Sequence, residues 1–281
     1  MGGRSVFRSR NAPGAARPSP ARLESRGGAR PGLGGMTPSV PPIVFVQGAA
    51  LVLLPIAAWT VVGRRLHFGR TGWAAIGYGC LFFILSQIVS APLRLGVDAL
   101  SLPALALAPA FSTIGAIAEQ GSRYIALRFI AQLREALSRP VAIAYGLGHG
   151  GFGSLAPGLV FLAYGLSANA QAGDPGVAQQ IAIWIETPLT LFAMPVLERI
   201  FALVRHVGLT LLVGASIVRR QISLLGVAIA WDAAANYLGV VVADMTEKNV
   251  LITEGVVLVA ALGALLYGLR ALPAAEPTST R

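Results

Sequence analysis

Charged residues are scarce in this chain. Asp, Glu, Lys and Arg make up only 12% of its 281 residues, whereas hydrophobic residues make up 55%. A soluble domain carries about 25% charged residues, and no stretch of this sequence is both polar and long enough to form one. The composition therefore excludes an ordinary soluble protein and predicts a polytopic membrane protein.

Cysteine is nearly absent, because Cys80 is the only one in the chain. A single cysteine cannot form a disulfide within the chain, and it excludes the cysteine-based metal motifs. Cys80 lies in an apolar run, so we expect it to pack in the protein core.

An internal sequence repeat is also missing. Many transporters are built from paired repeats with broken helices, so this absence counts against transport as the function of the chain.

Positive charge is concentrated at the N-terminus. The net charge is +10, but residues 1–41 hold seven arginines and one glutamate, which account for +6. This segment is rich in Gly, Pro and Ala and has no apolar period, so we predict a disordered tail, and another at 272–281. It contains no apolar run that would make it a signal peptide. Either the tail belongs to the protein or translation starts at Met36, and we expect no nucleic-acid partner.

Residues 42–271 are predicted to form an all-α bundle of transmembrane helices, each needing about 20 apolar residues to cross a bilayer. We expect about seven spans. The sequence is compatible with six to eight spans, because residues 181–218 are long for one span and contain Glu198 and Arg199. Tilt can absorb the extra length, so we favour one helix there. The expected spans are 42–62, 73–93, 103–131, 141–168, 188–218, 223–243 and 250–269.

Arginines near the span ends predict the orientation, since cytoplasmic loops are enriched in Lys and Arg. The loops after the odd-numbered spans hold most of them, so we expect a multi-pass protein of the cell membrane with its N-terminus outside and its C-terminus in the cytoplasm. The arginine-rich tail opposes this orientation unless Met36 is the true start. The supporting residues are Arg64, Arg65, Arg70, Arg134, Arg139, Arg219, Arg220 and Arg270.

Ionisable side chains inside the spans are the strongest functional signal, because such groups are costly in a bilayer. Glu119, His149, His206 and Asp232 each lie about nine to 13 residues from the expected cytoplasmic end of their spans, which is roughly 13–19 Å deep. The remaining histidine, His67, lies in a short loop. Four polar groups from four helices are thus expected in one layer, reached by water from the cytoplasmic side.

Such a layer can support hydrolysis in two ways. Imidazole and carboxylate groups are ligands for zinc and similar metals, so Glu119, His149, His206 and Asp232 are candidate metal ligands. A bound metal would activate a water molecule; without metal, Glu119 could act as a general base. Arg123, at i+4 from Glu119, can pair with it as a structural ion pair, or can orient it and stabilise an oxyanion.

Other polar residues in the spans have more than one interpretation. Asp232 and Asn236 share a helix face and either extend the polar layer or link helices. Glu198 and Arg199 form either a structural pair or the outer mouth of a cavity. We expect Glu254, near the outer end of the last span, to face lipid headgroups.

At these residues the chain resembles the YhfC family of intramembrane metalloproteases, which is related to CAAX-prenyl endopeptidases and bacteriocin-processing membrane proteins. The resemblance covers most of residues 42–270. Its most specific parts are Glu-Gln-Gly-Ser-Arg-Tyr at 119–124, Gly-Leu-Gly-His-Gly-Gly at 146–151, and the stretch 198–206. It implies that Glu119, Arg123, His149 and His206 are catalytic residues, that Zn²⁺ is a candidate cofactor, and that the substrates are peptide bonds of membrane-embedded proteins or peptides.

Three departures from the family pattern are compatible with other functions, and the third is Gly153, where the family often has another acidic residue. Gln120 stands where the family has a second glutamate, and Asp232 stands where it has a histidine. Asp can still bind a metal, whereas Gln cannot act as a base. The alternatives to proteolysis are a non-catalytic membrane scaffold or binding protein of the same family, and a transporter.

Overall fold

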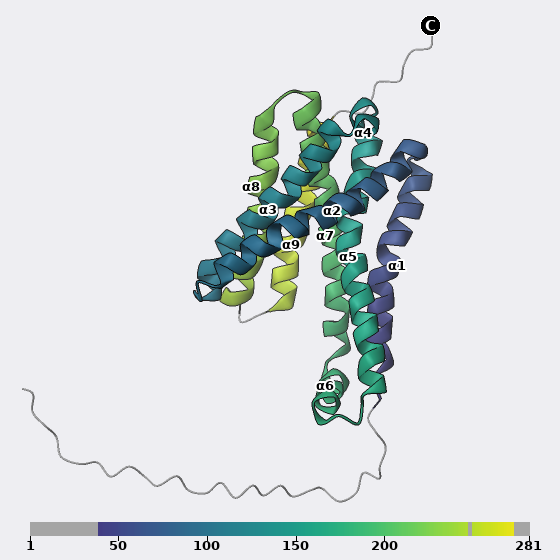
Figure 1. Ribbon diagram of the computed structural model, residues 1–281, viewed down its shortest axis with the longest axis vertical. Coiled ribbons are helices and arrows are strands. Elements are labelled where there is room, and N and C mark those ends of the chain that lie inside the picture. Colours follow the sequence, from purple (N-terminus) through teal and green to yellow (C-terminus); the bar gives the residue numbers. More distant parts are fainter. Residues whose placement is uncertain (1–38, 247–248, 273–281) are drawn as a thin grey trace, which may run out of the picture. The chain divides into compact units, whose positions relative to one another are not determined.

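A computed structural model describes residues 39–246 and 249–272 of the chain (Figure 1). In these ranges it contains nine α-helices and no strand. The two tails expected to be disordered lie almost wholly outside the described residues. The helices are α1 (Pro42–Arg65), α2 (Arg70–Asp98), α3 (Ala104–Phe129), α4 (Ala131–Glu135), α5 (Arg139–Ala170), α6 (Pro175–Glu186), α7 (Leu189–Val218), α8 (Ile222–Met245) and α9 (Val250–Ala271).

Six of these helices are long and apolar enough to cross a membrane, which confirms the prediction of a multi-pass helical bundle: α1, α2, α5, α7, α8 and α9. The seventh expected span, 103–131, is present as α3 with bounds one and two residues shorter, but it is not one of the six. Its polar residues, among them Glu119, Gln120 and Arg123, lower its mean hydropathy. Its outward face is nevertheless apolar, since Ile117 and Ile125 are both about half exposed.

Prolines set several of the helix boundaries. Pro140 and Pro175 occupy the first turns of α5 and α6, where the missing N–H costs nothing. Pro188 separates α6 from α7, because a proline disfavours helical backbone at the residue before it. Residues 189–218 form one continuous helix that includes Pro195. The stretch 181–218 therefore holds one candidate span, as expected, but it is not one helix, because residues 181–186 belong to the separate helix α6.

The central helix of the bundle is α5, which packs against α1, α2 and α7. On the other side of α7 lie α8 and α9, and α3 bridges α2 and α8 (Figure 1). One continuous core of buried apolar side chains joins α2, α3, α5, α7, α8 and α9. This arrangement directs the inner faces of α3, α5 and α7 toward one another, and these helices carry the three ionisable residues described below.

The crossing of α2 and α5 depends on Gly148. A Cβ atom at this position would overlap the backbone of Ile76 in α2. Small residues allow such close approach of helices in a membrane. Gly148 thereby fixes the distance between the two helices at the residue just before His149.

Replacing Gly148 by alanine is expected to destabilise the protein, because backbone atoms rather than a flexible side chain must move. Overpacking of this kind typically costs about 1–3 kcal/mol, so we expect the unfolding temperature in detergent to fall by roughly 3–10 °C. Gly226→Ala in α8 is the matched control, since a Cβ there meets nothing within 4 Å. An equal unfolding temperature for wild type and Gly148→Ala would contradict this packing.

Candidate metal centre

Three of the predicted site residues come together from three helices: Glu119 of α3, His149 of α5 and His206 of α7. One possible ligand atom from each lies within 4.8 Å of the others. Glu119 Oε2 is 3.5 Å from His149 Nε2 and 3.7 Å from His206 Nδ1. His149 and His206 are buried, and the Glu119 side chain is only 14% exposed. Of the four groups expected in one layer, these three lie together in the structure.

His149 is the most enclosed member of the group. Its ring packs edge-on against Phe83, with the centroids 5.2 Å apart, and lies 5.5 Å from the ring of His206. Neither ring nitrogen of His149 has a hydrogen-bond partner in the described part of the chain. Buried polar atoms are nearly always paired, so these nitrogens fit a ligand that the protein itself does not supply.

The backbone around His149 is held by side chains from two other helices. Trp59 Nε1 of α1 donates to the Leu147 carbonyl at 2.8 Å, and Cys80 Sγ of α2 donates to the Gly148 carbonyl at 3.3 Å. The cysteine therefore packs against the site helix, in agreement with the packing role expected for it. These contacts fix the turn of α5 that presents the imidazole.

Arg123 is fully buried beside the group and makes several polar contacts. It donates to Gln120 Oε1 at 2.6 Å and to Glu119 Oε2 at 3.4 Å, which confirms the expected i, i+4 pair. Its Nη2 also contacts Nδ1 of His206. A guanidinium can only donate, so His206 Nδ1 must accept, and the proton of the neutral imidazole then lies on Nε2.

This tautomer has a consequence for metal binding. The lone pair of His206 Nδ1 accepts the hydrogen bond from Arg123, and Nε2 carries the proton. His206 therefore has no free lone pair for a metal while this hydrogen bond exists. His149 is not limited in this way. A metal can use His206 as a ligand only after the guanidinium of Arg123 has moved away.

Asp232 is buried next to this group but is not one of the three residues that meet. Its Oδ2 accepts from Gln120 Nε2 at 2.8 Å, and its Oδ1 lies 3.7 Å from Arg205 Nε. Arg205 in turn donates to Asn236 at 2.8 Å. Of the two interpretations of Asp232 and Asn236, the contacts favour a link between helices.

Gln120 and Arg205 have a larger role than the sequence indicated. The Gln120 amide donates to Asp232 and accepts from Arg123, so it connects the acid of α8 to the Glu/His group. Arg205 was not predicted as a partner of Asp232. The signal available for it was its position in an apolar span, where a charge needs a partner.

A cavity of about 350 Å³ opens next to Glu119 and His206. Along α3 its wall includes Ser112, which precedes Glu119, and along α2 it runs from Phe83 to Arg94. It therefore extends toward the end of the bundle where α2 ends and α3 begins. With the orientation expected from the arginines this is the outer side, so the prediction that water reaches the site from the cytoplasmic side does not match the cavity.

Glu198, Arg199 and Glu254 lie near the opening of this cavity, and the position of Glu254 differs from the one expected. Arg199 pairs with Glu198 and donates to the Gly153 carbonyl at 3.3 Å, and it lines the cavity, as either interpretation of the pair allowed. Glu254 is only 9% exposed and lines an adjoining cavity with Glu198 and Arg205. The prediction that it faces lipid headgroups is therefore wrong, because α9 turns this side chain toward α7 and α8.

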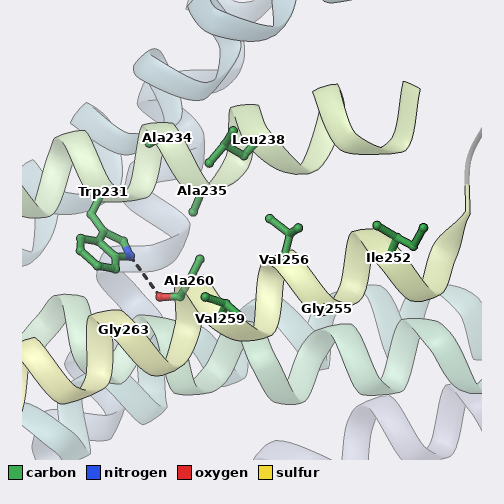
Figure 2. A pocket seen from close by; sticks show the side chains of 10 residues that line it. All are labelled: Trp231, Ala234, Ala235, Leu238, Ile252, Gly255, Val256, Val259, Ala260 and Gly263. Atoms are coloured by element: carbon green, nitrogen blue, oxygen red, sulfur yellow. Dashed lines mark hydrogen bonds between the residues drawn. The ribbon is translucent and has the colours of Figure 1, made fainter. Parts of the chain in front are cut away.

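A larger cavity lies elsewhere and has no comparable chemistry. It lies between α8 and α9, has a volume of about 640 Å³ and is lined by apolar residues such as Leu238, Ile252 and Val256 (Figure 2). On its wall, Trp231 Nε1 donates to the Ala260 carbonyl at 3.1 Å. None of its described lining residues is titratable, so this cavity offers no acid–base or metal-binding side chain.

The chain matches the model of a known protein family. The model of a family described as YhfC intramembrane metalloprotease matches residues 50–257, a range that contains Glu119, His149 and His206. No curated protein and no solved structure matches the chain.

Proposed function

We propose that this chain, which belongs to the YhfC intramembrane metalloprotease family, hydrolyses peptide bonds of membrane-embedded proteins or peptides at the Glu119/His149/His206 group. The observation that carries the proposal is the convergence of these three groups on one point inside a bundle of apolar helices. An ionisable cluster at such depth is costly and marks function by default.

The donor set fits a divalent metal. Two imidazoles and a carboxylate are ligands that zinc and its neighbours accept, and the unpartnered nitrogens of His149 provide a lone pair for one. We propose Glu119, His149 and His206 as ligands, with Asp232 as a fourth only if Gln120 and Arg205 release it. A metal bound there would supply Lewis-acid activation of water and of the peptide carbonyl.

The remaining chemistry belongs to the side chains themselves. Glu119 is the carboxylate nearest to both imidazoles, so it is placed to accept the proton of an attacking water molecule. Arg123 donates to Glu119 and lies among the same groups, so it can orient the carboxylate or stabilise an oxyanion. The low dielectric of the surrounding apolar helices strengthens each of these interactions.

The experiment that tests the proposal does not require a known substrate. Membranes from cells that produce the chain and from cells that lack it would be compared by mass spectrometry of protein N-termini. We expect new N-termini within or next to membrane spans of other proteins, and we expect a metal chelator to suppress them. An identical set of N-termini in both membranes would contradict the proposal.

We also propose that the protein resides in the cell membrane with its C-terminus in the cytoplasm, as the arginine distribution predicts. Reporter fusions at the C-terminus that are active only on one side of the membrane would test this orientation.

A second candidate function is a non-catalytic binding protein of the same family. The observation that favours it is the hydrogen bond between Arg123 and His206, which withholds one imidazole from a metal. Removing the guanidinium separates the two candidates.

Replacing Arg123 by methionine is expected to raise the affinity for Zn²⁺ by about tenfold or more, because a charge-assisted hydrogen bond worth about 1.5–3 kcal/mol no longer competes. Cleavage by the same variant should fall, since the oxyanion loses a donor. Competition with a fluorescent zinc chelator would measure the affinity. Arg128→Met is the control, because Arg128 lies on the same helix but lines a different cavity. Loss of zinc binding in Arg123→Met would show instead that the arginine holds the ligands in place.

A further inference from the structure

Arg94 is an arginine with no partner in the described part of the chain. Arg94 lies in the apolar helix α2 and makes no hydrogen bond or ion pair with any described residue. Its Nε is buried and has no hydrogen-bond partner. A guanidinium in this condition is unfavourable in a membrane protein unless it serves a ligand.

The neighbouring α3 holds this guanidinium in a defined place. The guanidinium of Arg94 lies so close to Gly115 that a Cβ atom added at Gly115 would overlap Nη2 of Arg94. Gly115 precedes Glu119 by one turn and lies on the same face of α3, about 6 Å away along the helix axis. Arg94 and Glu119 both line the cavity of about 350 Å³.

The other arginines around this cavity are already engaged. Arg199 pairs with Glu198, and Arg205 contacts Asp232 and Asn236. Among the described residues that line the cavity, Glu119 is the one carboxylate, against the three guanidinium groups of Arg94, Arg199 and Arg205. Cavity walls of low dielectric focus such a field, so the cavity favours an anionic group and has one free donor for it.

We propose that Arg94 binds a carboxylate of the substrate and thereby selects which peptide bond reaches Glu119. This inference rests on the proposed function. An extended peptide advances about 3.3 Å per residue, so 6 Å corresponds to about two residues. The substrate therefore carries its carboxylate, from an acidic side chain or from the C-terminus, about two residues from the cleaved bond. The planar guanidinium suits bidentate binding of this group.

The test measures binding of designed peptides to the full-length protein in detergent, in a chelating buffer. Two Leu/Ala peptides of about 20 residues would have an amidated C-terminus and differ only in carrying Asp or Asn at one position near an end. A third peptide would carry Asn at that position and keep a free C-terminal carboxylate. We expect the Asp peptide to bind about tenfold more tightly than the Asn peptide. Tight binding of the free-acid peptide alone would assign the carboxylate to the C-terminus, which also supports the proposal.

Variants of the two contact residues complete the test. Arg94→Gln should abolish the preference for the carboxylate, and Arg94→Lys should keep part of it, since a lysine retains the charge but not the fork. Gly115→Ala should weaken the preference by displacing the guanidinium, whereas the control Arg128→Gln should leave it unchanged. Equal binding of all peptides to the wild type, or a preference that survives Arg94→Gln, would overturn the proposal.

The outcome can be separated from that of the proposed function. A carboxylate preference that depends on Arg94 stands even if the protein produces no new N-termini, because binding alone is measured. Proteolysis without such a preference would leave the enzyme assignment intact and remove the role of Arg94.

Discussion

Replacing Glu119 by glutamine is expected to lower cleavage by about a thousandfold, while the protein remains folded. Glutamine has nearly the same shape and can still accept from Arg123, so the packing of α3 should persist. It cannot take a proton from water, and it is a poorer metal ligand than a carboxylate. Glu119 is the only carboxylate that meets both imidazoles among the described residues, so no neighbouring group can replace it.

The measurement is the rate at which a substrate identified by N-terminal mass spectrometry is cleaved by purified protein in liposomes. Glu135→Gln is the control, because Glu135 is 70% exposed and pairs only with Arg134. Unfolding temperatures of all three proteins establish that they are folded. A Glu119→Gln variant that cleaves at the wild-type rate would exclude Glu119 as the base and as an essential ligand.

Replacing His149 by alanine is expected to have the second large effect, a fall in Zn²⁺ affinity of more than about a hundredfold. Losing an outer-shell partner of a metal site already costs about 10–100-fold, and His149 would be a direct ligand. Neither nitrogen of this imidazole makes a hydrogen bond in the described part of the chain, so His149 can offer a ligand atom without breaking one.

Competition with a chelator of known affinity would measure this change. His67→Asn is the matched control: His67 is exposed, and asparagine tolerates the positive φ of 51° found there. Equal zinc affinities of wild type and His149→Ala would contradict the assignment of this histidine as a ligand.

The helices of this protein could be predicted closely from its sequence, because apolar runs of bilayer length have few alternative structures. The expected spans 141–168 and 188–218 differ from α5 and α7 by at most two residues at either end. The rise per residue is fixed, so depth could also be predicted, and it brought Glu119, His149 and His206 to one layer.

The direction in which each side chain points could not be predicted in the same way. Asp232 has the right depth, but the rotation of α8 about its axis places its carboxylate against Gln120 and Arg205. The prediction for Glu254 was wrong for the same reason, because the position of a residue near a helix end does not determine which neighbouring helix its side chain faces. Rotation depends on contacts between helices far apart in the sequence.

The contacts of the arginine side chains could not be predicted from the sequence either. Arg94 falls close to the end of its expected span, where a long basic side chain usually reaches the headgroups. Its position against Gly115 depends on how tightly α2 and α3 pack. The side of the membrane from which the cavity opens depends on the same packing.

Glu119, His149 and His206 are proposed to form a metal centre inside the membrane. Elemental analysis of the purified wild-type protein, beside His149→Ala and His206→Ala, tests this metal centre. We expect close to one equivalent of zinc or a similar divalent metal per chain in the wild type, and loss of that metal in both variants. A well-folded wild type that holds no metal even after supplementation would contradict this proposal.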